Sequence, residues 1–254
     1  MRISIVTPSF NQARYLEAAI NSVLNQNYPD VEYIIVDGGS DDGSVEIIRK
    51  YQKHLKWWVS ERDQGQTEAI NKGFAHASGE IFAWLNSDDT YLSGAFAEAA
   101  TFICDNPDVG LVYGDADFIN AEGIRVGRFP ARQTDYHRLR QGYVHIPQQA
   151  SFFRANLWKS LGPLDPSFYF AMDYDLWMRI ARYHTIIYTP RLWANFRLHG
   201  DAKTISADDR CWPEMLRVHY REGGSRFSVI VAKHYLRKIL GPIIRWRRRK
   251  YLTR

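Results

Sequence analysis

Cysteine is scarce in this 254-residue sequence, which has two, Cys104 and Cys211, neither of them in a CxxC pair. This scarcity argues against a disulfide framework and against a thiolate metal site, and it indicates a reducing compartment. Long apolar runs are also lacking, since none approaches the roughly 20 residues that span a bilayer. The first residues have no apolar core of the kind found in signal peptides. We therefore expect a cytoplasmic protein.

Acidic residues are absent from the last part of the chain. Residues 225–254 contain ten Lys or Arg and no Asp or Glu, which leaves residues 1–224 with 23 basic and 28 acidic residues, a net charge of −5. Apolar side chains interleave with these cations, and Gly241 and Pro242 divide the segment into two shorter amphipathic parts. We predict that this basic amphipathic tail associates peripherally with an anionic membrane surface, the inner face of the plasma membrane, and we expect no nucleic-acid partner. A solvated tail or a nucleic-acid contact is the alternative.

The residues that are present suit a large buried core, with 45% hydrophobic and 14% aromatic residues. Strands are predicted over four apolar runs, which are ISIVTP, VEYIIVD, KWWVSE and GEIFAWL. The amphipathic segments between these runs predict helices. The runs are almost continuously apolar, which is typical of a parallel sheet buried between helices. The sequence therefore predicts an α/β, Rossmann-like fold with a mostly parallel sheet flanked by helices.

The pattern changes after this first half. The segment VGLVYGDADFINAEGIRVGRF has a turn at Glu122 and Gly123 between two runs of strand character, so it predicts a hairpin and a small antiparallel addition to the sheet. We expect a loop around HIPQQASFFR, then helices over ANLWKSLG and AMDYDLWMRIARY and a strand over TIIYTP. No repeat or low-complexity linker interrupts residues 1–224, which we interpret as one body.

Polar residues follow each predicted parallel strand, in the segments TPSFN, DGGSDDGS, SERDQGQ and NSDD. The carboxyl ends of parallel strands meet at one edge of a sheet, where ligands bind. Asp88 and Asp89 repel each other unless a cation neutralises them, and Mg²⁺ and Mn²⁺ prefer carboxylate oxygens. The alternative is a helix N-cap before YLSGAFAEAA. The other acid-bearing strand ends favour a metal site.

Three ordered motifs resemble inverting glycosyltransferases of family 2, which have the GT-A fold: SIVTPSFNQARYLEAAINSVLNQNYPDVEYIIVDGGSDDGS, NKGFAHASGEIFAWLNSDD and FAMDYDLWMRIA. The resemblance covers residues 1–205. It implies transfer of a sugar from a nucleotide-diphosphate sugar, for which we expect a UDP-sugar, to an acceptor hydroxyl with inversion at the anomeric carbon. A divalent metal, Mn²⁺ or Mg²⁺, is the implied cofactor. A saccharide or lipid-linked glycan is the implied acceptor, in the synthesis of cell-surface polysaccharide or glycolipid. Residues 1–114 would form the nucleotide-binding half and residues 115–224 the acceptor half.

The resemblance also implies a set of residues that bind the donor nucleotide: Thr7, Pro8, Phe10, Asp37, Asp63, Gln64, Gly65, Asn71, Lys72, Asn86 and Asp88. In the family's acid-any-acid motif the first acid usually faces the ribose and the last faces the metal. Asn86 stands at the first position here, and its amide retains the capacity to bind a ribose hydroxyl. We assign the metal to Asp88, with Asp89 as a second ligand or a ribose partner. Asn71 and Lys72 are equally consistent with roles on a helix surface.

The catalytic base should be a carboxylate on the acceptor side, within reach of the incoming hydroxyl. The motif FAMDYDLWMRIA offers Asp173 and Asp175. The family has a Glu before the functional acid, and Met172 replaces it here, so only Asp173 matches. Asp175 is better explained as an acid in the first turn of a helix, where the helix dipole favours it. We predict that Asp173 is the base.

The segment NFRLHGDAKT resembles the family's lid over the nucleotide. Arg197 and His199 alternate on an extended run, so they point to the same side, with Lys203 close by in the sequence. We expect these three residues at the diphosphate, and His199 is also a candidate metal ligand. In a metal-independent enzyme the three would take the place of the ion. Gln148 and Gln149 are expected to touch the acceptor or the sugar.

Two other classes of protein share some of these features. A sugar nucleotidyltransferase also combines a doubly wound sheet with paired acids, but it is expected to carry a basic, Gly-rich loop near the first strand, and TPSFNQARY has one Arg and no Gly. A non-catalytic nucleotide- or nucleic-acid-binding module would not need Asp173. Both remain alternatives to the glycosyltransferase.

Overall fold

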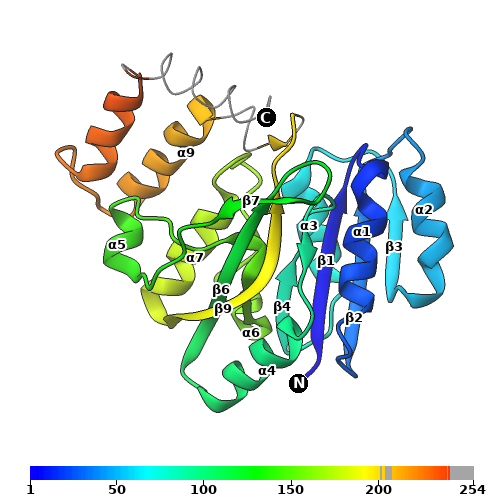
Figure 1. Cartoon of the computed structure of the whole chain (residues 1–254). Coiled ribbons are helices and arrows are strands. Elements are labelled where there is room, and N and C mark those ends of the chain that lie inside the picture. Colours follow the sequence, from blue (N-terminus) through cyan, green and yellow to red (C-terminus); the bar gives the residue numbers. More distant parts are fainter. Residues whose placement is uncertain (201, 204–207, 239, 241–254) are drawn as a thin grey trace.

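The computed structural model describes residues 1–200, 202–203, 208–238 and 240 (Figure 1). The predicted tail segment from Gly241 and Pro242 to the last residue lies outside this part of the chain. The first half alternates strands and helices: β1 (Ile3–Ser9), α1 (Ala13–Leu24), β2 (Val31–Asp37), α2 (Ser44–Tyr51), the short 3-10 helix η1 (Gln52–His54), β3 (Trp57–Ser60), α3 (Gln66–Ala75) and β4 (Ile81–Trp84). The four strands pair in parallel in the order β3-β2-β1-β4. The predicted parallel sheet is confirmed.

The second half extends the same sheet with four antiparallel pairings and one parallel pairing, between β6 and β9. Its elements are β5 (Thr90–Tyr91), α4 (Ala95–Asp105), β6 (Val109–Ile119), β7 (Arg125–Arg128), α5 (Tyr136–Arg140), the 3-10 helix η2 (Gln148–Ala150), β8 (Ser151–Arg154), α6 (Ala155–Leu161), α7 (Met172–Tyr183) and β9 (Thr185–Arg197). The strand order is β3-β2-β1-β4-β8-β6-β9-β5, and β7 pairs with β6. The β6-β7 hairpin forms at the predicted turn. The α/β fold with an antiparallel addition is therefore confirmed.

The prediction of a loop around HIPQQASFFR is wrong for the last four residues, because these form strand β8 (Ser151–Arg154). This strand lies between β4 and β6 and is antiparallel to both. Ser151, Phe152 and Phe153 are all buried, because helices cover both faces of the sheet at this point. A short strand that is buried on both faces shows no polar alternation, so periodicity does not reveal it.

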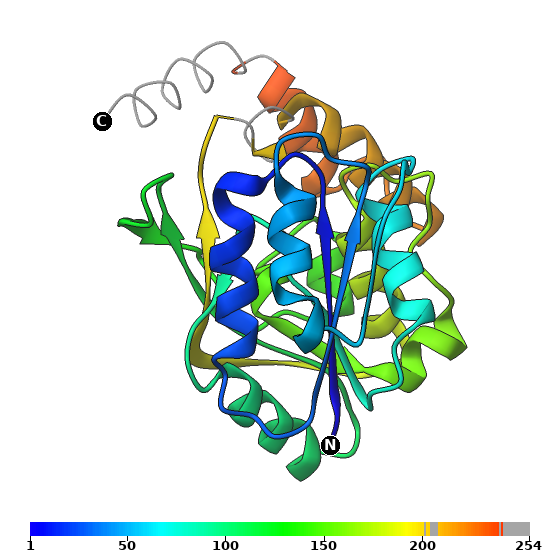
Figure 2. The same ribbon diagram turned by 90° about the vertical axis from the view of Figure 1, so that its right-hand side faces the viewer.

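Two apolar cores lie on the two faces of the sheet. Along β1, Ile3 and Ile5 point to one face, where α1 and α4 pack, and Val6 points to the other, where α3, α6 and α7 pack. Figure 2 shows α1 and α2 side by side over the parallel half of the sheet. The result is a three-layer arrangement that leaves the carboxyl ends of β1, β2, β3 and β4 free to carry loops.

The predicted boundary between body and tail at 224/225 does not separate a packed part from an unpacked one. Helix α9 (Asp208–Arg221) is followed by a helix over 229–238, and Ile230 and Val231 are buried in the core beside Met215 and Val218. These two aliphatic residues therefore do not belong to a lipid-facing side. None of the helices in the described ranges has the length and the apolar character that crossing a membrane requires.

Candidate active site

A cleft of about 1480 Å³ lies at the carboxyl edge of the parallel strands. The loops after β1, β2, β3 and β4 contribute to its lining, as do η2, α7, α9, the helix over 229–238 and the loops after β7, α5 and β9. Many of the predicted site residues line it: Pro8, Phe10, Asp63, Gln64, Gly65, Asn86, Asp88, Gln148, Gln149, Asp173 and Lys203. The fold thus brings together residues that are up to 195 positions apart, and those in the loops after the first four strands follow the strand-end rule.

Three residues predicted at the nucleotide serve the protein's own packing, and none is among the described residues that line the cleft. Thr7 is fully buried, and its hydroxyl lies 3.1 Å from the Tyr33 hydroxyl. Asn71 donates to the carbonyl of Leu164 and accepts from its amide, at 2.9 and 3.0 Å. The Lys72 ammonium lies 2.7 Å from a carboxylate oxygen of Glu61. The structure thus does not support a nucleotide contact for Thr7, and for Asn71 and Lys72 it favours the alternative of a role within the protein.

Asp37 closes β2 as expected, but its partners come from the protein. The carboxylate accepts hydrogen bonds from the Ser40 amide at 2.9 Å, from the Ser40 hydroxyl at 2.6 Å and from the Ser60 hydroxyl at 2.7 Å. Asp37 is fully buried and is not among the described residues that line the cleft. It shapes the loop of Gly38 and Gly39, which do line the cleft, and a direct contact with the base or ribose is not supported.

Asp63 lies where the loop after β2 approaches the loop after β3. A Cβ atom added to Gly38 would stand 3.1 Å from Oδ2 of Asp63, so the absence of a side chain at Gly38 permits this approach. Asp63 accepts a hydrogen bond from the Gly65 amide at 2.8 Å, and burial raises the pKa of its carboxyl. This half-buried acid is well placed to accept hydrogen bonds from a ligand in the cleft.

The two adjacent acids after β4 have different environments. Asp88 is 17% exposed and lines the cleft. Asp89 is 1% exposed, and its two oxygens accept from the Arg197 amide at 2.8 Å and from the Asn86 side chain at 3.3 Å. Burial, with the charge of Asp88 beside it, raises the pKa of the Asp89 carboxyl well above its usual value. Asp89 fixes the end of β9 to this loop, so the expectation that it is a second metal ligand or ribose partner is not supported.

Arg197 was predicted at the diphosphate, but its guanidinium is committed to backbone carbonyls. It donates to Asp88 at 2.8 Å, to Asn120 at 3.1 Å and to Ala121 at 3.2 Å. It also stacks over the Tyr15 ring, with its central carbon 4.9 Å from the ring centroid. Arg197 is 6% exposed. It supports the loop that carries Asp88 and does not reach into the cleft.

His199 contacts Asp88 and is the remaining candidate for a metal partner. Its Nε2 atom lies 3.0 Å from Oδ2 of Asp88, the ring lies 4.7 Å from the Tyr15 ring, and Nδ1 is buried with no partner among the described residues. The described residues hold no group of three His, Cys, Asp or Glu side chains that could bind an ion. Asp88 and His199 fit a site with few protein ligands, of the kind that the phosphate oxygens of a substrate complete.

Lys203 is the one lid residue of the predicted three that lines the cleft. Its ammonium donates to the Gln66 side chain at 2.8 Å and lies 4.0 Å from the centroid of the Tyr169 ring. Burial lowers the pKa of Lys203 to about 8. A cation at this position attracts negative charge in the cleft, from a ligand or from a neighbouring carboxylate.

Asp173 is the second residue of α7 and lines the cleft as predicted. It is half-buried, and burial raises the pKa of its carboxyl to about 6, against the opposing effects of a 2.6 Å hydrogen bond from the Tyr174 amide and the positive charge of Lys203. A carboxyl group with a pKa near 6 is mostly ionised at neutral pH and is a stronger base than an ordinary aspartate. These properties suit a general base.

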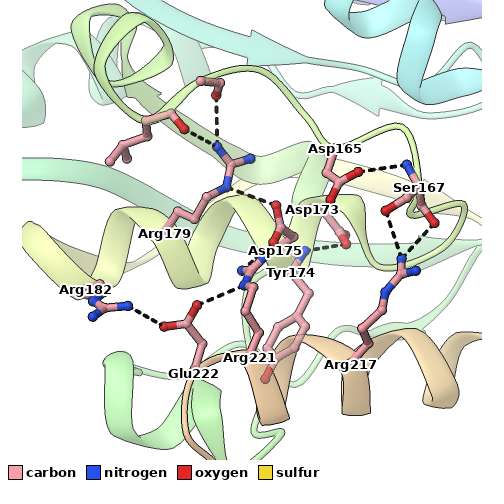
Figure 3. A network of polar contacts seen from close by, with 12 residues as sticks. Asp165, Ser167, Asp173, Tyr174, Asp175, Arg179, Arg182, Arg217, Arg221 and Glu222 are labelled. Atoms are coloured by element: carbon pink, nitrogen blue, oxygen red, sulfur yellow. Dashed lines mark hydrogen bonds and ion pairs between the residues drawn. The ribbon is translucent and has the colours of Figure 1, made fainter.

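Asp175, two residues further on, is tied into a network of ion pairs (Figure 3). It is 1% exposed and lies 3.0 Å from Arg179 of α7 and 2.6 Å from Arg221 of α9. Glu222 adds contacts of 3.1 Å with both Arg221 and Arg182. The prediction of a structural role for Asp175 agrees with this geometry, although the partners are arginines rather than the helix dipole alone.

Glu214 of α9 is a site residue that sequence reasoning missed. Its carboxylate accepts from the amides of Tyr169, Phe170 and Ala171 at 3.1, 2.7 and 2.8 Å, and it thereby satisfies backbone donors at the N-terminus of α7. It fixes the turn that presents Asp173. The contact joins segments more than 40 positions apart in the sequence, and no local pattern signals it.

Besides the Ser9 hydroxyl, two buried N–H donors in the cleft lining lack partners among the described residues. They are Nε1 of Trp84 and Nε2 of Gln149. Trp84 was not predicted at the site, and Gln149 was expected near the acceptor or the sugar. The neighbouring Gln148 donates to the Trp84 carbonyl at 2.7 Å. Buried donors usually find a partner, so these two groups are available to a hydroxyl-rich ligand.

The mixed sheet and the cleft at its carboxyl edge, lined by Asp88 after β4 and by Asp173 of α7, fit a sugar-transferring enzyme of the GT-A fold. The family model described as glycosyl transferase family 2 matches residues 4–162, and the chain belongs to this family. The protein is a glycosyltransferase.

Its relatives include an uncharacterized glycosyltransferase of Mycobacterium tuberculosis, 32% identical over 184 residues, which are 70% of this chain and 68% of the relative. An uncharacterized glycosyltransferase of Rickettsia typhi is 28% identical over 80% of this chain and 66% of its own length. A PGL/p-HBAD biosynthesis glycosyltransferase of Mycobacterium bovis is 26% identical over 97% of this chain and 98% of its own length. The chain thus spans about two thirds of the first two relatives and nearly all of the third.

Two solved structures share the fold. Staphylococcus aureus TarS 1-349 in complex with UDP-GlcNAc has a TM-score of 0.70 and 18% identity, covering 86% of this chain and 65% of that one. The mannosyltransferase PcManGT from Pyrobaculum calidifontis in complex with GDP-Man and Mn²⁺ has a TM-score of 0.67 and 21% identity, covering 92% of this chain and 69% of that one. At these identities the likeness concerns the fold.

Proposed function

We propose that the protein transfers a sugar from a nucleotide-diphosphate sugar, UDP-linked, to an acceptor hydroxyl with inversion at the anomeric carbon. The observation that carries this proposal is the presence of Asp173 and Asp88 in the lining of one cleft. A base and a site for the leaving group are the two requirements of a single displacement. The nucleotide-sugars bound to the neighbouring structures, UDP-GlcNAc and GDP-Man, support a donor of this kind.

The donor lies at the strand ends in this proposal. Asp63, Gly65 and Asn86 contact the nucleoside, and Trp84 and Gln149 donate to sugar hydroxyls. Asp88 and His199 hold a divalent cation, Mn²⁺ or Mg²⁺, which when bound neutralises the charge of the diphosphate. The Mn²⁺ in the mannosyltransferase structure supports this cofactor.

The transfer is one in-line step. Asp173 takes the proton of the acceptor hydroxyl, the acceptor oxygen forms a bond to the anomeric carbon, and the bond from that carbon to the diphosphate oxygen breaks. The electron pair leaves with the nucleoside diphosphate, and the proton ends on the Asp173 carboxylate. Lys203, which is close enough to lower the pKa of Asp173, keeps that carboxylate ionised until the hydroxyl arrives.

The acceptor is a saccharide or a lipid-linked glycan, used in the synthesis of glycolipid or cell-surface polysaccharide at the inner face of the plasma membrane. The Mycobacterium bovis relative, which acts in PGL/p-HBAD biosynthesis and matches along its whole length, supports a glycolipid product. Exposed apolar side chains support peripheral contact with a membrane, among them Phe227 at 100%, Tyr235 at 59% and Leu236 at 55% exposure.

A donor panel tests this function. Purified protein is mixed with UDP-, GDP- and dTDP-sugars and Mn²⁺, and binding is followed by thermal shift and nucleotide release by a coupled assay. We expect a UDP-sugar to raise the melting temperature and to release UDP, and we expect proton NMR to show the inverted anomeric configuration in a product. Pyrophosphate release from a nucleoside triphosphate would instead indicate a nucleotidyltransferase. Binding of none of the donors would indicate a non-catalytic module.

A further inference from the structure

The helix over 229–238 forms part of the cleft wall as well as part of the core. Lys233, Leu236, Arg237 and Leu240 all line the cleft. Leu236, Arg237 and Leu240 follow Lys233 by three, four and seven positions, which places them on one face of a helix. Ile230 is buried against the body, and a Cβ atom on Gly142 would stand 2.8 Å from the Cγ1 atom of Ile230, so the helix is packed closely against the loop that follows α5.

Two cations on this helix face lie over aromatic rings of the body. The Lys233 ammonium is 4.0 Å from the centroid of the Tyr143 ring, and the central carbon of the Arg237 guanidinium is 4.8 Å from that of Trp212. Lys233 has no carboxylate partner among the described residues. Burial, followed by the charge of Arg237, lowers the pKa of Lys233. Two neighbouring cations in a partly buried wall attract an anion with more than one charge.

The surroundings of these cations are apolar. The lining near them comes from the loop after α5, from α9 and from the helix itself: Tyr143, Val144, Ile146, Trp212, Met215 and Leu236. Leu236 and Leu240, at 55% and 37% exposure, extend the apolar lining to the protein surface. The loops after the parallel strands instead bring acids and amides to the cleft, among them Asp63, Asn86 and Asp88. The cleft thus has a polar side and a side that is apolar with two cations.

The cleft is also larger than one ligand requires. Its volume of about 1480 Å³ exceeds the range of roughly 300–1,000 Å³ for sites of a single small molecule. Asp173 of α7 and Trp212 of α9 line this same cleft. The side with the two cations is therefore the place for the second substrate.

We infer that this side of the cleft is an acceptor subsite for a phosphate attached to an apolar chain, with Lys233 and Arg237 binding the phosphate and Leu236 contacting the chain. The inference rests on the proposed transfer reaction and narrows its acceptor to an amphiphile with an anionic group next to the acceptor sugar. It also gives the C-terminal helix a role in substrate binding that is separate from any contact with membrane lipids.

The test is a binding experiment on the full chain in metal-free buffer, so that no ion at Asp88 attracts the phosphate. Octyl phosphate below its micelle concentration is titrated by calorimetry. Inorganic phosphate serves as the probe without the alkyl chain, and octyl glucoside as the probe without the charge. We expect octyl phosphate to bind roughly tenfold more tightly than either, because both parts of the subsite contribute. Equal affinity for inorganic phosphate and octyl phosphate would overturn the inference.

Matched variants separate the subsite from general surface charge. Lys233→Ala should weaken octyl phosphate binding roughly tenfold, and Lys233→Arg should retain most of it. Lys238→Ala removes the same charge from the same helix at an exposed position outside the cleft lining and should bind like the wild type. Equal losses in the Lys233→Ala and Lys238→Ala variants, or no loss in either, would contradict a specific site. Thermal unfolding of each variant checks that the helix remains packed.

A vesicle experiment tests whether Lys233 binds the phosphate of an acceptor or the headgroups of a bilayer. Flotation of the same variants with phosphatidylcholine vesicles containing phosphatidylglycerol should show no larger loss for Lys233→Ala than for Lys238→Ala. If Lys233→Ala loses vesicle binding and keeps octyl phosphate binding, the cation contacts headgroups and the inference is wrong.

Nucleotide-sugar turnover without octyl phosphate binding would contradict this inference alone. Octyl phosphate binding without binding of any nucleotide-sugar would contradict the proposed reaction and leave the anion site standing.

Discussion

The Nε2 atom of His199 lies 3.0 Å from Oδ2 of Asp88, and the contact joins the segment after β9 to the loop after β4, 111 positions away in the sequence. Both side chains are largely buried, at 4% and 17% exposure. A ring nitrogen and a carboxylate oxygen at this separation are positioned to share one cation. The relationship explains why His199 belongs to the site although it does not itself line the cleft.

His199→Ala should therefore raise the Mn²⁺ concentration needed for half-maximal activity by at least about tenfold, the effect of losing one partner of a metal site. Asp88→Ala should weaken donor binding and turnover together, because it removes the ion's main anchor. Activity is measured across a Mn²⁺ titration, with the exposed His54→Ala as the control. Full wild-type activity in excess EDTA would contradict a metal-dependent reaction.

The raised pKa of Asp173 predicts the acidic limb of the pH profile. Burial moves the pKa of this carboxyl from 3.8 to about 6, so the base is ionised above that pH and protonated below it. We expect kcat/KM to fall about tenfold per pH unit below pH 6 and to be level just above it. A steady-state profile from pH 4.5 to 8 measures this. A profile that stays level down to pH 4.5 would show that the essential base is an ordinary exposed carboxylate.

Lys203 tunes that profile through its charge. Its ammonium lowers the pKa of Asp173, so Lys203→Met should raise that pKa and move the acidic limb to higher pH. The position of the limb is the readout, because it is independent of any loss in donor affinity. Lys53→Met is the control. This residue lies at an exposed position in η1, and its substitution should leave the limb unchanged. If the acidic limb does not shift in the Lys203→Met variant, the charge of Lys203 does not lower the pKa of Asp173.

Much of the fold was predictable because the first four strands are apolar runs closed by polar residues. The same rule placed Asp88, Asn86 and Asp63 in the cleft. Strand β8 was missed, since four residues buried on both faces carry no periodic signal. The basic composition of the C-terminal segment concealed the packing of the helix over 229–238 against the body, which depends on two aliphatic residues among many cations.

Several of the site residues that sequence reasoning misassigned have a partner far away in the sequence. Asp89 is satisfied by the Arg197 amide 108 positions away, and Arg197 by the carbonyl of Asn120, 77 positions away. Each residue type was compatible with a ligand contact, and the tertiary structure uses it for support. Asp173 lies in the cleft lining as predicted, and Asp175, which was assigned to the first turn of the helix, is held by arginines of α7 and α9.

The structure also changes the test for membrane association. Removal of everything after residue 224 would delete Ile230 and Val231 from the core, so a shorter truncation to residues 1–240 is the better variant. It removes six of the ten C-terminal cations. We expect flotation with phosphatidylglycerol vesicles to drop strongly, since each cation near such a surface contributes about 1 kcal/mol. Equal recovery of the full chain and the 1–240 variant would exclude these cations as the anchor, and neutral vesicles serve as the control.

The most direct test of the central claim is the turnover of the Asp173→Asn variant with the donor that the panel identifies. The substitution keeps the size of the side chain and removes its basicity, and Asp108→Asn, an exposed acid outside the cleft lining, is the matched control. We predict that Asp173→Asn lowers kcat by about 10²–10⁴-fold, the usual contribution of a general base, while donor binding by thermal shift stays at the wild-type level. Near wild-type kcat in the Asp173→Asn variant would contradict the assignment of Asp173 as the base.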